Sequence, residues 1–257
     1  MERKATIRKC LIGLGAGLVG LANSAIAGME YSLYYSRAFN NISAEKTVFT
    51  SKTSPDQEHG LNAGFYKFGF SGAHVSDKSK KGIRFKTGAE IFYGQANDSV
   101  DDIASYGTED LEGTADFELN ADVLGIGAFV GAEKRFFKDR FGLAAKAGVE
   151  VAKVDAKLDG RGYVSSSSGD FAAGTTLNSK IDDILYDAYV GASVSYDLGA
   201  DFTAFAEAKY GLGNELSWDE TTTTVNINGE TGTGTGITSG SATLAGFEAK
   251  VGVKKTF

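Results

Sequence analysis

Residues 83–93 read IRFKTGAEIFY, and their side chains alternate between two kinds. Ile83, Phe85, Ile91 and Tyr93 belong to one alternating set, which is mainly apolar. The residues between them are charged or small, apart from Phe92. Successive side chains of a β-strand point to opposite faces. The stretch therefore predicts a strand with one apolar face and one charged face.

The same period of two recurs along most of the chain. Residues 141–152 and 202–213 repeat it with many alanines, and the glycines in both make a helix the weaker interpretation. Less regular alternation completes the set. The predicted strands are residues 31–39, 61–70, 83–94, 124–136, 141–152, 184–196, 202–213 and 243–257.

The connections between these strands alternate strictly in length. The long ones are residues 40–60, 97–118, 155–183 and 214–241, and the short ones are residues 71–82, 137–140 and 197–201. All long segments therefore meet at one end of the predicted sheet, as in bacterial outer-membrane barrels. The pattern predicts an all-β fold, an eight-stranded antiparallel up-and-down transmembrane β-barrel with four long extracellular loops and three short periplasmic turns. A count of ten strands stays open.

The beginning of the chain has the pattern of an export signal. Four basic residues lie within residues 1–9, and an uncharged run from Cys10 ends in Ala25-Ile26-Ala27. This predicts a secretory signal peptide over residues 1–27 and a barrel domain over residues 28–257, so that the mature chain begins at or near Gly28. An uncleaved anchor helix is the alternative, and glycines within the run disfavour it.

Composition narrows the classes of function. A net charge of −7 and a pI near 5.0 argue against nucleic-acid binding, which needs clustered Lys and Arg. No later stretch has 18 consecutive apolar residues, which argues against a bundle of transmembrane helices. The long segments carry 20 acidic against 5 basic residues. This predicts a solvated outer face, with cation capture as the alternative.

The charged faces of the predicted strands would line the barrel interior. They carry six basic and six acidic residues: Lys67, Arg84, Lys86, Lys146, Lys209, Lys250, Glu90, Glu133, Glu150, Asp187, Glu207 and Glu248. An eight-stranded barrel has room for little more than side chains, and unpaired buried ions are costly. The balance predicts a structural salt-bridge network in the lumen. A gated narrow channel is the alternative.

No catalytic, cofactor or metal motif stands out. The two histidines, His59 and His74, are expected at the long-loop end and in a short turn, too far apart to share a site. His59 beside Glu58, with Ser54 nearby, leaves a lipid-modifying enzyme as a third alternative. The Gly-rich residues 229–240 lack the Lys of a phosphate loop and predict flexible exposed loop.

The end of the chain carries the most local resemblance. Phe247, Ala249, Val251 and Val253 alternate up to a terminal Phe257, while a Lys stands third from last. The chain resembles the small eight-stranded outer-membrane barrels that include the transmembrane domain of outer-membrane protein A and the opacity-type surface proteins. Aromatic residues near strand ends fit the girdles of such barrels. They are Tyr31, Tyr35, Tyr93, Tyr186, Tyr196, Phe136 and Phe257.

The resemblance has functional implications. It implies location in the outer membrane of a Gram-negative bacterium, with membrane lipids and the barrel-assembly machinery as partners and Phe257 as the assembly signal. The expected function is a surface scaffold whose loops mediate adhesion or contact with a host or environment. A narrow porin-like channel and an outer-membrane lipid enzyme are the alternatives.

Overall fold

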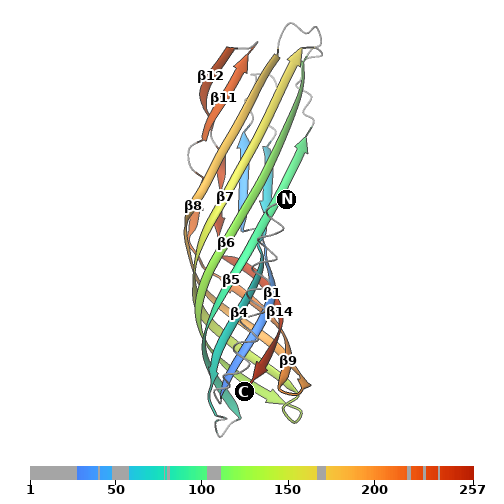
Figure 1. Cartoon of the computed structure of the whole chain (residues 1–257), viewed down its shortest axis with the longest axis vertical. Helices are drawn as coiled ribbons and strands as arrows, with labels where there is room; N and C mark the ends of the chain where they lie inside the picture. The colour runs from blue at the N-terminus through green and yellow to red at the C-terminus, as the bar shows by residue number, and fades with distance from the viewer. Residues whose placement is uncertain are drawn as a thin grey trace.

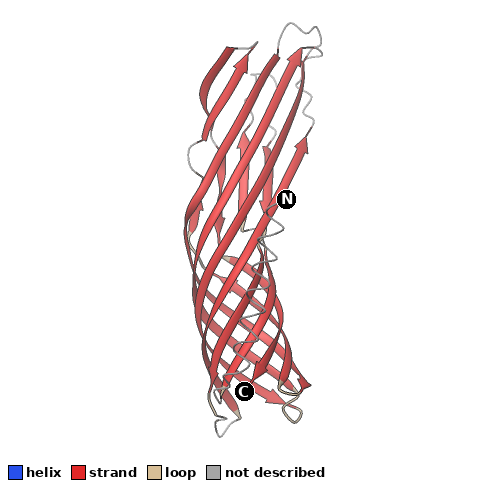
Figure 2. Ribbon diagram, viewed as in Figure 1, coloured by secondary structure: helices blue, strands red, loops and turns tan. Residues whose placement is uncertain are grey.

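The structure, a computed structural model, describes most of the chain after residue 27. The described residues are 28–39, 41–47, 58–77, 79, 82–102, 111–166, 172–218, 221–227, 230–236 and 238–257. Strands dominate them (Figure 2). In this part of the chain there is no helix that is both long enough and apolar enough to cross a bilayer. The expected signal peptide and the serine of the expected enzyme site, Ser54, lie outside the described residues.

Eight antiparallel strands close into a ring (Figure 1). In order around the ring they are β1 (Met29–Ala38), β4 (Tyr66–Val75), β5 (Ile83–Asp102), β6 (Leu111–Phe136), β7 (Phe141–Ser166), β8 (Ala172–Gly199), β9 (Phe202–Gly211) and β14 (Gly246–Thr256). The first and last strands pair from Glu30 opposite Thr256 to Ala38 opposite Glu248, which closes the barrel. The predicted fold class, an eight-stranded up-and-down barrel, is confirmed.

One predicted strand and one predicted turn are misplaced. Residues 61–70 do not form a single strand, because the chain breaks between β3 (Glu58–Ala63) and β4. A Cβ at Gly64 would overlap the carbonyl oxygen of Ala38, so glycine permits the close approach at this break. The barrel strand therefore continues to Val75, and His74 lies in β4 rather than in a turn.

The long segments are strand over much of their length, which corrects their prediction as loops. β6, β7 and β8 have 26, 26 and 28 residues, whereas about 9–11 suffice to cross a bilayer. Above the barrel, β7 keeps its period of two: Val154 and Ala156 are buried, and Lys153 and Lys157 are exposed. Its polar residues mark a strand that faces water. Polar residues occur on such strands and in loops alike, and the alternation of buried residues distinguishes the two.

The remaining strands lie beyond the barrel together with the far parts of β5–β8. This region is here called the extension. β10 (Glu215–Ser217), β13 (Thr238–Thr243), β2 (Ile42–Thr47) and β3 form a four-stranded antiparallel sheet in that order. β11 (Thr221–Ile227) and β12 (Glu230–Gly236) form a hairpin that pairs with the upper part of β8. Residues 229–240 thus contribute to β12 and β13, so their prediction as loop is wrong.

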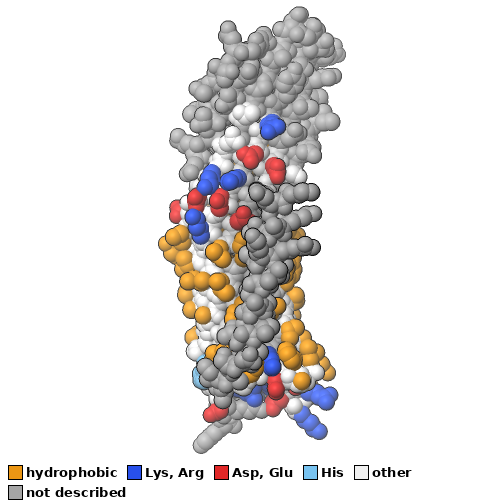
Figure 3. Space-filling view, in the orientation of Figure 1, with side chains coloured by type: hydrophobic (Ala, Val, Ile, Leu, Met, Phe, Trp, Pro, Cys, Tyr) orange, Lys and Arg blue, Asp and Glu red, His pale blue; other side chains and the backbone are white. Residues whose placement is uncertain are grey.

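A belt of apolar side chains surrounds the outside of the lower barrel (Figure 3). Ile126 is 63% exposed and Val190 62%, although both are aliphatic. Aromatic residues lie near both edges of the belt: Tyr31 contacts Phe257 at one edge, and Tyr35 contacts Phe68 toward the other. An apolar belt bordered by aromatic residues, around a ring without free edges, is what hydrocarbon requires of a β-protein. The barrel therefore spans a membrane.

The belt gives a direct prediction for Val190. Replacing it with Arg places a charge near the middle of the apolar belt and should destabilise the folded barrel by about 2–4 kcal/mol. The matched control is Leu212→Arg, because Leu212 is 73% exposed but lies just beyond the end of β9. That change should cost only about 0–1 kcal/mol. Equal losses for the two variants, measured by reversible unfolding in lipid vesicles, would contradict the placement of the belt.

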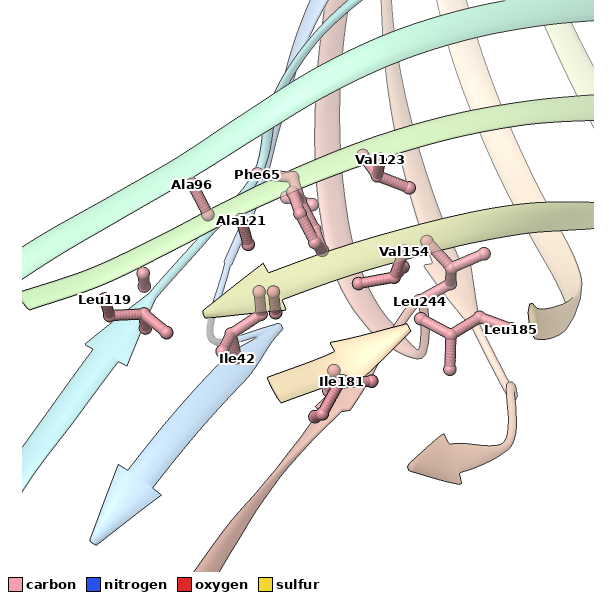
Figure 4. Close-up of a cluster of buried hydrophobic side chains, with 14 of the residues drawn as sticks. Ile42, Phe65, Ala96, Leu119, Ala121, Val123, Val154, Ile181, Leu185 and Leu244 are labelled. Carbon is pink, nitrogen blue, oxygen red and sulfur yellow. The ribbon is translucent and has the colours of Figure 1, made fainter. Parts of the chain in front are cut away.

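The mouth of the barrel is filled by a second apolar group, here called the plug cluster (Figure 4). The long strands contribute Leu119, Val123, Val154, Ile181 and Leu185 from their inner faces, and the four-stranded sheet with its connections contributes Ile42, Leu61, Phe65, Trp218 and Leu244. Phe65 and Ile42 are fully buried. The cluster closes the lumen on the side of the extension.

Candidate functional site: the barrel interior

The inner face of the barrel below the plug cluster is lined by buried ions. Strand alternation turns the charged residues inward, opposite the apolar belt. Lys67, Glu133, Lys209 and Lys250 are each at most 2% exposed. Buried ions of this kind need partners, and the interior divides into two groups that supply them.

The first group, the upper cluster, lies beneath the plug. Lys67 Nζ lies 2.7 Å from Glu248 Oε2, and Lys209 Nζ lies 3.1 Å from the same oxygen. Lys209 also donates a hydrogen bond of 2.6 Å to Glu150 Oε1. Each of these two ammonium groups thus meets at least one carboxylate.

The same cluster continues around Glu90. Lys250 donates to Glu90 Oε2 at 3.0 Å, and the Tyr189 hydroxyl donates to Glu90 Oε1 at 3.0 Å. Lys146 Nζ lies 2.9 Å from Glu207 Oε1 and also faces the ring of Tyr189. A Cβ at position 148 would lie 2.6 Å from the Tyr189 hydroxyl, so a glycine there makes room for this ring.

The second group, the lower cluster, lies near the short turns and centres on Glu133. Its carboxylate pairs with Lys86, with Lys254 at 3.2 Å and with Arg135 at 2.6 Å. Glu30 joins the cluster, at 2.8 Å from Lys86 and 3.4 Å from Lys254. A cavity of about 70 Å³, lined by side chains of both clusters, has room for a few water molecules.

Two of the twelve residues from the sequence pattern have no ion pair among the described residues. Asp187 is buried opposite Glu150 on the neighbouring strand, and neither of its carboxylate oxygens has a hydrogen-bond partner in the described part of the chain. Arg84 is half-buried at the start of β5, at the end of the barrel with the short turns. The structure brings the other ten into the two clusters.

Sequence reasoning missed five members of the interior. Glu30, Arg135 and Lys254 complete the lower cluster, and Tyr34 and Tyr189 pack against the upper one. The signal was available for Lys254, which continues the inward series of Glu248 and Lys250. Glu30 could not be found in this way, because the predicted first strand began one residue later.

Phe257 lies at the seam of the barrel. Its backbone N–H donates to the carbonyl oxygen of Met29 at 2.9 Å, and its own carbonyl oxygen accepts from Gly28 at 2.9 Å. Lys255, the residue third from last, places its ammonium 4.7 Å from the centre of the Phe257 ring. The last residue is therefore tied to the first strand of the ring.

The described residues offer no arrangement for metal binding. They contain no group of three or more His, Cys, Asp or Glu side chains that could hold a metal ion. The backbone places His59 in β3 of the extension and His74 at the opposite end of the barrel. The chemistry that this interior performs on its own is ion pairing.

Comparisons with solved structures return barrels of low similarity. Ail, the attachment invasion locus protein of Yersinia pestis, has 12% identity and a TM-score of 0.33, with 89% of this chain and 99% of that chain covered. Neisserial surface protein A has 12% identity and a TM-score of 0.32, with 90% and 98% covered. The outer membrane protease OmpT of Escherichia coli has 9% identity and a TM-score of 0.29, with 89% and 96% covered.

The identification of the protein rests on its own structure. No family model and no curated protein matches the chain. Eight antiparallel strands close without a free edge, lipid-facing side chains form a belt around them, and the charges of these strands turn inward. The chain therefore forms a small eight-stranded transmembrane β-barrel.

Proposed function

We propose that the protein is a non-conducting membrane anchor that holds a rigid β-structured extension outside the cell for contact with other surfaces. The observation that carries this proposal is the double closure of the lumen. The ion clusters fill the lower interior, and the plug cluster fills the mouth above them. A barrel filled in this way leaves its exposed extension as the part available to partners.

Hydrogen bonds between distant segments support a rigid extension. The Asn41 side chain donates to the carbonyl oxygens of Thr243 at 3.0 Å and Ala245 at 3.2 Å. The Trp218 indole donates to the carbonyl oxygen of Ser43 at 2.9 Å. These bonds join the segment after β1 to the segment before β14. The extension is thus tied together across the barrel seam.

The alternatives have less support. A narrow pore would need the ion clusters and the plug cluster to open together, since both lie across the lumen. A lipid enzyme would need a histidine near an acid and a nucleophile, and the described residues place no such group together, since the serine expected beside His59 lies outside them. We therefore propose a role without catalysis.

Removal of the β11–β12 hairpin tests the contact role. β10 and β13 are antiparallel neighbours, so a short Gly-Ser linker can join Trp218 to Thr238 without moving the barrel. Cells that display the shortened protein should lose adhesion to host cells and extracellular matrix, compared with cells that display the full chain. Arg140→Gln, in a periplasmic turn, is the control. Unchanged adhesion, with equal surface amounts of all three proteins, would contradict the proposal.

A further inference from the structure

The outer wall of β5–β8 changes its chemistry in layers with distance from the membrane. Directly above the apolar belt lies a charged layer (Figure 3). Lys153 Nζ lies 3.1 Å from Asp182 Oδ1, and Lys180 Nζ lies 2.9 Å from Asp182 Oδ2. Asp122, in the same layer, accepts hydrogen bonds from Tyr93 at 2.7 Å and Gln95 at 2.8 Å. This layer is at the level of lipid headgroups.

A polar groove of about 970 Å³ lies above the charged layer. It crosses four neighbouring strands, and Glu118, Asp159 and Asn178 stand opposite one another in a single row of the sheet. Asn97 and Asn120 form the adjacent row toward the membrane. Arg161 also lines the groove, on the side of the first row away from the membrane. The side chains of these six residues alternate along their strands with buried residues and therefore point outward.

The groups in this groove have the chemistry for binding sugar hydroxyls. Amides both donate and accept hydrogen bonds, and carboxylates accept them. The Asn120 amide already donates to Glu118 Oε1 at 2.6 Å, which holds the two planar groups side by side. Arg161 is exposed. Its guanidinium suits an acidic substituent, such as a carboxylate or phosphate.

The height of the groove suggests which saccharide it meets. Glu118 is six residues above Leu124, which belongs to the apolar belt. Six residues span about 20 Å along a strand, and tilt reduces this to roughly 15 Å above the hydrocarbon. The wall therefore presents apolar, charged and then polar layers. A glycolipid of the outer leaflet has the same order, with acyl chains, charged headgroup and sugars.

We propose that this groove binds the oligosaccharide of the outer-leaflet glycolipid, with Arg161 on an acidic substituent and the amides and carboxylates on sugar hydroxyls. The site is separate from the contact role of the extension, and it rests on the placement of the barrel in an outer membrane. It would fix the orientation of the lower extension relative to the membrane surface.

Binding of defined glycolipids to the purified barrel in detergent micelles tests this site. The probes are lipopolysaccharide with a complete core oligosaccharide, lipid A without core sugars, and the detached core oligosaccharide. Arg161→Gln removes the guanidinium, and Arg140→Gln makes the same change at the periplasmic end, where Arg140 is also exposed. Native mass spectrometry measures the affinity, and electrophoretic mobility without heating checks that both variants fold.

The proposal predicts that the complete glycolipid binds at least tenfold more tightly than lipid A. It also predicts that Arg161→Gln removes this difference and that Arg140→Gln preserves it. Equal affinities of the unmodified protein for the two lipids, or an unchanged difference in Arg161→Gln, would overturn the site. If the detached oligosaccharide binds as tightly as the complete glycolipid, the membrane source is wrong and the groove takes a soluble saccharide.

Discussion

Replacing Glu90 with Ala is expected to destabilise the folded barrel by about 3–5 kcal/mol. Glu90 is 4% exposed and accepts hydrogen bonds from Lys250 and from the Tyr189 hydroxyl. Without it, the Lys250 ammonium keeps the ring of Tyr34 at 3.9 Å and, as its paired carboxylate, only Glu207 at the longer distance of 3.8 Å. A buried ion that loses its close partner retains the cost of desolvation. Reversible urea unfolding in lipid vesicles measures the loss.

Glu215→Ala is the matched control for this prediction. Glu215 is exposed in β10, so its replacement by Ala is the same chemical change at the surface. This variant should alter the free energy of unfolding by no more than about 0.5 kcal/mol. If Glu90→Ala is as mild as this control, water must solvate the upper cluster. That result would contradict a closed lumen.

Replacing Phe65 with Ala should have an effect of similar size, about 3–5 kcal/mol. The Phe65 side chain is fully buried in the plug cluster, so its removal leaves a cavity among packed apolar groups. Phe137→Ala is the control, because Phe137 is 81% exposed in the short turn between β6 and β7. The control should stay within about 0.5 kcal/mol.

Two measurements on the Phe65 variant distinguish the contribution of the plug cluster from the integrity of the barrel wall. The loss should appear in the unfolding free energy, while protease resistance of the membrane-spanning part stays intact. If Phe65→Ala proves no more harmful than Phe137→Ala, the plug cluster does not contribute to the stability of the barrel.

The membrane-spanning part of the fold could be predicted because lipid imposes a strict rule on sequence. Each crossing needs an outward apolar set, and residues 83–93 and 184–196 show it plainly. The extension obeys a weaker rule, because water accepts polar side chains on strands and loops alike. Only the inner series Val154, Ala156 and Leu158 shows that β7 continues.

The interior was predictable as a set of residues but not as a set of pairs. Alternation assigns a residue to a face, whereas pairing depends on the relative shift of all eight strands. Glu30 and Glu133 both contact Lys86, although they are about one hundred residues apart. The plug cluster depends on the same kind of long-range geometry, since Phe65 and Leu244 join one cluster although they are far apart in the sequence.

Single-channel recording in planar bilayers tests the closed lumen most directly. The unmodified protein should insert without stable conductance steps, because the ion clusters and the plug cluster lie in series across the lumen. Electrophoretic mobility without heating confirms that the inserted protein is folded. Stable, repeatable conductance from the unmodified barrel, with ion selectivity that changes in Glu90→Ala, would contradict the account and establish a transport pore.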